Sequence, residues 1–253
     1  MRRRNSKHLA GILILCTLLG ACAVSPTGDP WEPANRGIYA VNDGLDRVTL
    51  KPVAKGYRKV VPAFMRRGVG NFFSNLRTPL TIVNQVLQGK GRVALSDIGR
   101  LLVNSTVGIG GMFDPATKMG LEEHREDFGQ TLAVWGVPDG PFVLVPLLGP
   151  RNLRDAITTP LDIIAYPLVH YENPAVRDKL WGLDAVNIRT RLLAGEGLID
   201  DSADPYITIR DAYRQNRQYL IHDGDPPNDD DELFDEFLEQ DTAPANDRGD
   251  QHE

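Results

Sequence analysis

The chain has 253 residues, a formal net charge of −6 and two cysteines, Cys16 and Cys22. A core of roughly 200 residues needs no cross-links, and Cys16 lies in an N-terminal segment that we expect to be removed, which excludes a disulfide-stabilised fold. The acidic balance comes from the C-terminus, where residues 223–253 hold 13 Asp and Glu against Arg248 alone. This composition predicts a disordered tail, although apolar residues among the acids allow a transient helix that docks on a partner.

Residues 1–21 have the pattern of an export signal. A basic start precedes an apolar run from Leu9 to Leu19, which has the length of a signal peptide. The run ends in Leu19-Gly20-Ala21-Cys22, which resembles the bacterial lipobox. We predict a lipoprotein signal over residues 1–21, acylation of Cys22 and a tether over residues 22–28, with an ordinary secretory signal as the alternative. Ala23, instead of an aspartate, favours the outer membrane by resemblance to sorted lipoproteins.

The rest of the chain, residues 29–222, predicts an all-α domain. Apolar spacings of three and four, with proline and glycine at the corners, predict six to eight mostly short helices, and strand-like alternation is scarce. Thr-Pro, Asn-Pro and Asp-Pro pairs are taken as helix starts. The expected helices span residues 35–45, 50–65, 78–89, 92–104, 159–168, 174–195 and 205–220.

The helix expected over residues 92–104 carries a wide apolar stripe. Leu95, Ile98 and Leu102 share one face, which Leu101 and Val103 broaden, so we expect the helix to be buried on more than one side. The segment Gly108-Ile109-Gly110-Gly111 follows, without the lysine of a P-loop or the spacing of a dinucleotide fingerprint. It predicts a sharp turn with close backbone packing.

No acid occurs from Arg47 to Ser96, although ten basic residues do. An unbroken positive stretch attracts phosphate groups, and outside the cytoplasm these belong to lipids more than to nucleic acid. We predict head-group contacts for four basic residues of this stretch: Lys51, Lys55, Arg58 and Lys59. The alternative is a solvated face whose charges are balanced by acids elsewhere in the fold.

The segment from Pro141 to Pro150 has ten residues without a charged or hydrogen-bonding side chain. It is too short to span a bilayer, which takes about 20 apolar residues, and its prolines oppose a helix. It is therefore expected to enter one leaflet part-way, with burial as ordinary core as the alternative. The candidate contact residues are Gly140, Pro141, Phe142, Val143, Leu144, Val145, Pro146, Leu147 and Leu148.

The sequence lacks the motifs of common enzyme classes. It has no Gly-x-Ser-x-Gly elbow and no metal-binding histidine spacing, and Asp127-Phe128-Gly129 stands without the other kinase motifs. Glu122, Glu123 and Glu126 form an acidic cluster of the kind that is usually solvated. We predict no enzyme, no metal and no cofactor; a lipid hydrolase using His124 is the catalytic alternative.

Several motifs resemble the VacJ/MlaA lipoproteins in order and spacing over residues 29–222. Ala34, where the family usually has phenylalanine, and the long acidic tail depart from the family pattern. The motifs that carry the resemblance are Asp29-Pro30-Trp31-Glu32-Pro33, Asn35-Arg36, Leu45-Asp46, Pro52-Val53-Ala54, Gly68-Val69, Asn71-Phe72-Phe73-Ser74-Asn75-Leu76, Leu87-Gln88-Gly89, Asn104-Ser105-Thr106, Glu126-Asp127-Phe128-Gly129-Gln130-Thr131-Leu132, Trp135-Gly136-Val137, Gly140-Pro141-Phe142 and Leu153-Arg154-Asp155.

The resemblance implies a ring of short helices in the inner leaflet of the outer membrane around an amphipathic channel. It implies removal of mislocalised phospholipids from the outer leaflet, in association with trimeric porins, and their delivery to a soluble periplasmic carrier. The lipid asymmetry of the membrane is thereby maintained. The alternative is a structural or surface lipoprotein that is tethered to porins without transport.

Overall fold

The computed structural model describes residues 29–226. Cys22, the signal and tether, and the acidic tail from residue 227 lie outside the described residues, so the predictions for them stay predictions. The helices and strands, in chain order, are α2 (Glu32–Val48), α3 (Leu50–Val60), α4 (Ala63–Leu87), α5 (Gly91–Thr106), α6 (Pro115–Lys118), α7 (Phe128–Val134), β1 (Phe142–Val145), β2 (Gly149–Asn152), α8 (Leu153–Ala165), the 3-10 helix η1 (Pro167–His170), α9 (Pro174–Leu192), α10 (Glu196–Asp200) and α11 (Pro205–Ile221).

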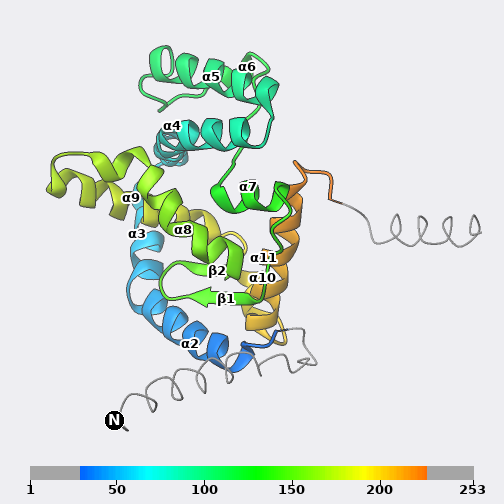
Figure 1. Ribbon diagram of the computed structural model, residues 1–253. Helices are drawn as coiled ribbons and strands as arrows, with labels where there is room; N and C mark the ends of the chain where they lie inside the picture. The colour runs from blue at the N-terminus through cyan, green and yellow to red at the C-terminus, as the bar shows by residue number, and fades with distance from the viewer. Residues whose placement is uncertain (1–28, 227–253) are drawn as a thin grey trace, which may run out of the picture.

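A two-stranded hairpin in the lower part of the view packs against helices α2, α8 and α11 (Figure 1). Strand β1 packs against α2, and both strands pack against α8, while β2 also packs against α11. At the upper end of the view, α4 pairs with α5, and α5 packs against α6. The predicted helical fold is confirmed. The hairpin lies in the apolar run over residues 141–150, for which strand structure was not predicted.

The hairpin has a regular antiparallel register. Phe142 pairs with Asn152 and Val145 pairs with Gly149, so the turn lies at residues 146–148. Phe142 and Leu144 point to the same face, as alternate strand residues do, and form a buried cluster with Tyr206 of α11. A second cluster joins Phe73 of α4 to Tyr166 and Leu168 near η1. These two small clusters hold much of the apolar core.

Two predicted helix starts are wrong. Pro79 lies inside α4 and Pro160 lies inside α8, where each lacks a backbone N–H and costs about 3 kcal/mol in a typical helix. The hydroxyl of Thr78, the expected cap, instead donates to Ser74 O at 3.2 Å, as in a helix interior. Packing of α4 against α5 and α9 outweighs the local signal.

Other predicted helix starts and turns agree with the structure. Asn173 accepts hydrogen bonds from the backbone at the start of α9, and Asp204 does the same for α11, so both predicted caps are confirmed. The glycine turn is also confirmed, because Gly111 has φ 88° and a Cβ on Gly108 would lie 2.4 Å from Asn104 O. Among the described helices, none is long and apolar enough to cross a membrane.

The predicted burial of the α5 stripe is wrong, because the helix is inverted relative to a soluble protein. Leu95 and Leu102 are 69% and 60% exposed, whereas Asp97 is 1% exposed. The buried positions Asp97, Arg100 and Asn104 recur at spacings of three and four, which also defines a helix face. Helix α5 therefore turns a polar face inward and an apolar face outward.

Candidate functional site

The inverted pattern extends beyond α5. Within residues 29–226, buried polar or charged side chains outnumber buried apolar ones about two to one, whereas charged side chains are rarely buried in soluble domains unless they are paired. Large apolar side chains lie outside instead. The exposed apolar set includes Val53, Val60, Phe64, Met65, Val83, Val86, Leu95, Leu102, Val107, Ile109, Phe113, Met119, Trp135, Leu147, Ile157, Leu161 and Ile164. We call this set the outer apolar surface.

The outer apolar surface comes from many elements. It includes residues of α3, α4, α5 and α8, the loop before α6 and the turn of the hairpin. Monomeric soluble proteins rarely expose apolar patches of more than a few hundred square ångströms, and larger ones mark a membrane or protein partner.

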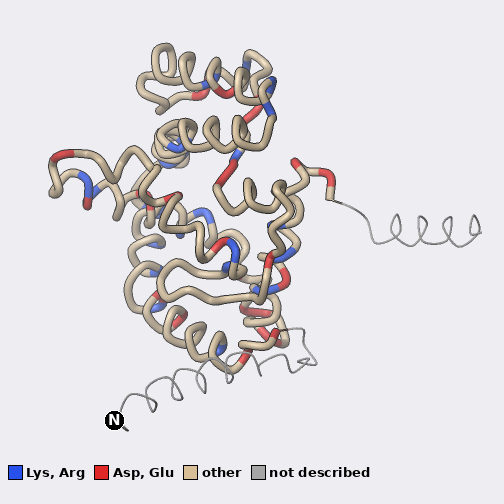
Figure 2. The backbone as a smooth tube through the Cα atoms, viewed as in Figure 1, with Lys and Arg blue, Asp and Glu red and all other residues tan. Residues whose placement is uncertain are grey.

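The hairpin divides the candidate contact residues into two groups. Phe142 is 1% exposed and Leu144 is also buried, so these two side chains belong to the core. Val143 and Val145 are half-buried, as is Pro141, while Gly140 and Pro146 are exposed. At the turn, Leu147 is 78% exposed and Leu148 is also exposed. Among these candidates, only the turn residues Leu147 and Leu148 therefore present large exposed apolar side chains, and the turn carries no charge (Figure 2).

Two asparagines of α2 hold the free edge of β1. Asn35 Nδ2 donates to Phe142 O at 3.0 Å, and Asn35 Oδ1 accepts from Leu144 N at 2.9 Å. Asn42, two turns later, makes the same pair of bonds to Val145 O and Leu147 N. The side-chain amides thus replace a third strand and satisfy an edge that would otherwise be unpaired.

A buried ion cluster fixes the other side of the hairpin. Arg217 of α11 binds both carboxylate oxygens of Asp127 at 2.7 Å and Asp155 Oδ1 at 2.8 Å, and Tyr213 donates to Asp155 at 2.5 Å. A Cβ on Gly129 would lie 2.3 Å from Asp155 Oδ1. The kinase-like tripeptide at residues 127–129 is therefore a packing motif, since its aspartate binds arginine and its glycine provides the space.

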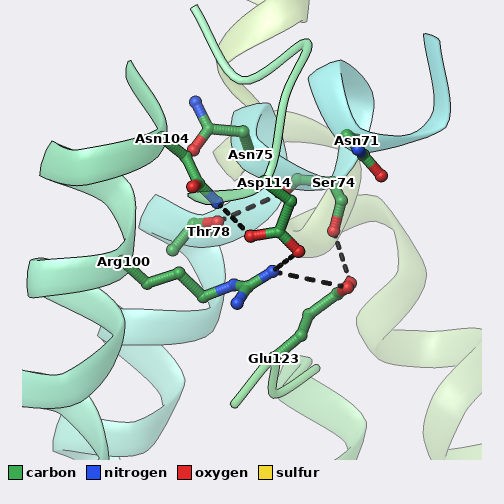
Figure 3. A pocket seen from close by; sticks show the side chains of 8 residues that line it. All are labelled: Asn71, Ser74, Asn75, Thr78, Arg100, Asn104, Asp114 and Glu123. Carbon is green, nitrogen blue, oxygen red and sulfur yellow. Dashed lines mark hydrogen bonds and ion pairs between the residues drawn. The ribbon is translucent and has the colours of Figure 1, made fainter. Parts of the chain in front are cut away.

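A small polar pocket, partly open to solvent, lies between α4, α5 and the segment before α7 (Figure 3). Arg100 projects into it from α5 and binds Asp114 at 2.7 Å. Glu123 lies opposite, accepting from Ser74 Oγ at 2.5 Å. Hydrogen bonds to these partners lower the pKa of Asp114 and Glu123, although burial acts in the opposite direction. Both carboxylates are therefore ionised at neutral pH.

The basic stretch over residues 47–96 contains both paired and unpaired side chains. Lys51 pairs with Glu196 at 2.8 Å, and Arg77 and Lys90 also bind acids from outside the stretch, as the solvated-face alternative predicts. Lys55, Arg58 and Lys59 are exposed, with no side-chain hydrogen bond or ion pair to any described residue. They lie on α3 beside the outer apolar surface. Arg67 and Arg92 of the same stretch are also exposed and have no ion pair with a described residue.

The histidine and glutamate candidates form no recognisable catalytic or metal site. His124 Nδ1 lies 3.0 Å from Asp97 Oδ2, and Gln85 donates to the same oxygen at 2.5 Å. Glu126 pairs with Lys90, and Glu122 is exposed. Among residues 29–226, no group of three His, Cys, Asp or Glu side chains could hold a metal ion.

The fold and the surface together define a helical protein with a polar interior and an apolar exterior. The model of the MlaA lipoprotein family matches residues 27–220 of the sequence. The chain therefore belongs to the MlaA lipoprotein family, as its motifs predicted.

Individual relatives agree. The chain is 35% identical over 229 residues to the intermembrane phospholipid transport system lipoprotein MlaA of Escherichia coli K12, covering 86% of this chain and 90% of that protein. It is 37% identical to an uncharacterized protein of Rickettsia prowazekii, covering 76% and 78%. A structure solved to explain maintenance of bacterial outer membrane lipid asymmetry superimposes with a TM-score of 0.67 at 34% identity, covering 76% of this chain and 98% of the other.

Proposed function

We propose that this protein is an outer-membrane lipoprotein that removes phospholipids from the outer leaflet and passes them towards the periplasm, thereby maintaining lipid asymmetry. The relatives named for intermembrane phospholipid transport and the neighbour structure concerned with outer membrane lipid asymmetry support this function. The observation that carries it in this chain is the inversion of α5, where leucines face outward and Asp97, Arg100 and Asn104 face inward.

The inversion suits lipid transport for a physical reason. A phospholipid that moves between leaflets must keep its charged head group in polar surroundings, since exposing it to hydrocarbon costs several kcal/mol. Its acyl chains, by contrast, gain nothing by leaving the bilayer. A protein with an apolar exterior and a polar interior serves both parts of the molecule, and a ring around an amphipathic channel is the arrangement that we propose.

The remaining features have places in this proposal. Acylated Cys22 anchors the chain in the periplasmic leaflet, where several acyl chains give stable attachment. The turn residues Leu147 and Leu148 contact acyl chains or a trimeric porin. Lys55, Arg58 and Lys59 contact head groups at the edge of the leaflet, and a soluble periplasmic carrier receives the lipid. The transfer needs no catalytic step.

The function is tested by measuring phospholipid at the cell surface. A strain lacking the gene is treated with a membrane-impermeant amine reagent, and labelled phosphatidylethanolamine is counted with and without the restored gene. We expect more labelled lipid without the protein. Unchanged labelling, with porin still recovered on the purified protein, would favour the alternative of a porin-tethered lipoprotein without transport.

The anchor is tested separately with Cys22→Ser. We expect the variant to leave the membrane fraction for the periplasmic soluble fraction, or to bind membranes far more weakly, since only the outer apolar surface would retain it. A variant that is recovered with the outer membrane as completely as the natural protein would contradict acylation as the anchor.

A further inference from the structure

Three arginines converge outside the polar pocket, and the proposed function has not yet assigned them a role. Arg77 comes from α4, Arg125 from the segment before α7, and Arg191 from the last turn of α9. We call them the arginine cluster. Arg77 and Arg191, the first and last of the three in the sequence, are more than 100 residues apart, so only the fold brings the cluster together.

Contacts between the elements place the cluster. Arg77 pairs with Asp184 of α9 and lies over the ring of Tyr166, 5.2 Å from its centroid. Ser74, one turn before Arg77 on α4, donates to Glu123 Oε1 at 2.5 Å. Figure 3 shows the Glu123 carboxylate turned towards Ser74.

The third arginine reaches this region from α9. Arg191 lies two turns after Asp184, and therefore on the same face of that helix. Arg125 binds the same Glu123 oxygen as Ser74, at 3.1 Å, which holds its own side chain beside α4. Helices α4 and α9 pack directly against each other, so the cluster spans their junction.

The charges of the cluster are not balanced. Arg77 uses Asp184, and Arg125 uses Glu123, but Arg191 has no hydrogen bond or ion pair with any described residue. Although its surface is exposed, partial loss of hydration lowers the pKa of Arg191, and the positive charges of Arg125 and Arg77 lower it further. A guanidinium held among like charges is stabilised by an added anion.

Unpaired polar atoms lie on the same face of α9. Asn187 is buried between Asp184 and Arg191, and its Nδ2 donor has no partner among the described residues. Buried amide donors are nearly always satisfied in native proteins, and an exception calls for a missing partner. A Cβ on Gly70 of α4 would lie 3.3 Å from Asn187 Nδ2, so this unpaired donor marks the junction of α4 and α9 where the cluster lies.

We propose that Arg191 and Arg125 bind the phosphodiester of a phospholipid head group at the junction of α4 and α9. Guanidinium groups bind phosphate oxygens through two parallel hydrogen bonds, and Arg125 and Arg191 are both exposed, so a head group can reach them from outside. Arg77 remains on Asp184 and adds positive potential. This proposal rests on the proposed function, and it identifies the polar binding site for the head group that this function requires.

The test uses the full-length protein, purified from membranes in detergent and incubated with donor vesicles that contain fluorescent phosphatidylglycerol. Transfer of the labelled lipid to acceptor vesicles is measured for the natural protein, for R125Q with R191Q, and for R92Q. Arg92 is an exposed arginine at the start of α5 without a described partner, which makes it a matched control. Thermal unfolding of each variant verifies that the fold is retained.

We expect the double variant to transfer lipid about tenfold more slowly, the scale of lost hydrogen bonds to a charged group, while R92Q transfers at the natural rate. R191K should restore part of the rate when it replaces R191Q, because charge returns without the guanidinium fork. Equal rates for the double variant and the natural protein would overturn the site but leave the proposed function intact. No transfer by the natural protein would contradict the proposed function itself.

A second arm distinguishes lipid from free phosphate, which offers the same oxygens. Lipid-free protein is dialysed against radioactive inorganic phosphate. We expect no saturable binding, because the bilayer supplies and positions the head group. Saturable binding that is lost in the double variant would assign the cluster to soluble phosphate and overturn the lipid assignment.

Discussion

Asn42 binds the backbone of Leu147 at the turn of the hairpin, 105 residues further along the chain, with Asn42 Oδ1 accepting from Leu147 N at 3.0 Å. Leu147 has φ 64°, a left-handed conformation that costs a non-glycine residue roughly 1–2 kcal/mol. The hydrogen bond offsets part of that cost and keeps the most exposed apolar residue of the turn in a fixed place.

Asn42→Ala should therefore loosen the turn more than it destabilises the whole protein. We expect a loss of about 1 kcal/mol in the free energy of unfolding, and faster amide hydrogen exchange confined to residues 145–149. Asn216→Ala, at an exposed position on α11 without a described hydrogen bond, is the control. Exchange at the turn that is equally slow in both variants would show that α2 does not hold the hairpin.

Asp162 should make stability depend on pH. Burial raises the pKa of Asp162 to about 6, and the charge of Asp127 adds to this, although Phe128 N donates to the carboxylate at 3.0 Å. Because the folded-state pKa lies above 3.8, the ordinary value for an aspartate, the folded chain holds a proton that the unfolded chain releases. This contribution is complete at low pH and is lost as the pH rises through about 6.

Asp162→Asn keeps an oxygen acceptor for Phe128 N and removes the titration. We expect the difference in unfolding free energy between the variant and the natural protein to grow between pH 5 and pH 7.5, reaching about 1 kcal/mol in favour of the variant after allowance for solvent screening. Denaturant unfolding at several pH values measures it. A difference that stays constant over this range would mean that Asp162 is already ionised at pH 5.

The three unpaired basic residues of α3, Lys55, Arg58 and Lys59, should promote binding to anionic membranes. Reversal of both charges in the double variant Lys55→Glu and Arg58→Glu is expected to weaken binding to vesicles containing phosphatidylglycerol at least tenfold, since each basic residue near such a surface contributes about 1 kcal/mol. The effect should shrink in high salt because screening shortens the reach of the charges. It should also slow lipid transfer if head groups pass this helix.

Lys179→Glu provides the comparison for the single variant Lys55→Glu, because Lys179 is exposed on α9 without a described partner. Vesicle flotation of the acylated protein measures the membrane binding of these two single variants. If reversal at Lys179 weakens binding as much as reversal at Lys55, the effect comes from net charge, and the α3 residues would be an ordinary solvated face.

Much of the backbone could be predicted from local signals. Asn173 and Asp204 were recognised as caps because a side-chain oxygen before proline has only local requirements. The helix starts predicted at Pro79 and Pro160 were wrong because long-range packing of α4 and α8 decided where these helices begin. The hairpin was missed because it is short and apolar on both faces, which gives no alternating pattern.

The candidate site was harder to predict because burial in this protein does not follow hydrophobicity. The apolar stripe of α5 was expected to face inward, and the structure places it outside. A signal was present in the same helix, since Asp97, Arg100 and Asn104 fall on one face, but choosing between the faces required knowing which solvent each meets. The arginine cluster left no sequence signal, because its members are brought together only by the packing of α4 and α9.

The most direct measurement locates the α5 stripe relative to the acyl chains. A fluorophore on L102C of the acylated protein in vesicles is tested for quenching by brominated acyl chains and by aqueous iodide, with N216C as the exposed polar control. An apolar exterior covered by lipid predicts strong bromolipid quenching and little iodide quenching at position 102, with the reverse at position 216. Iodide quenching at position 102 equal to that at position 216, without bromolipid quenching, would contradict the account.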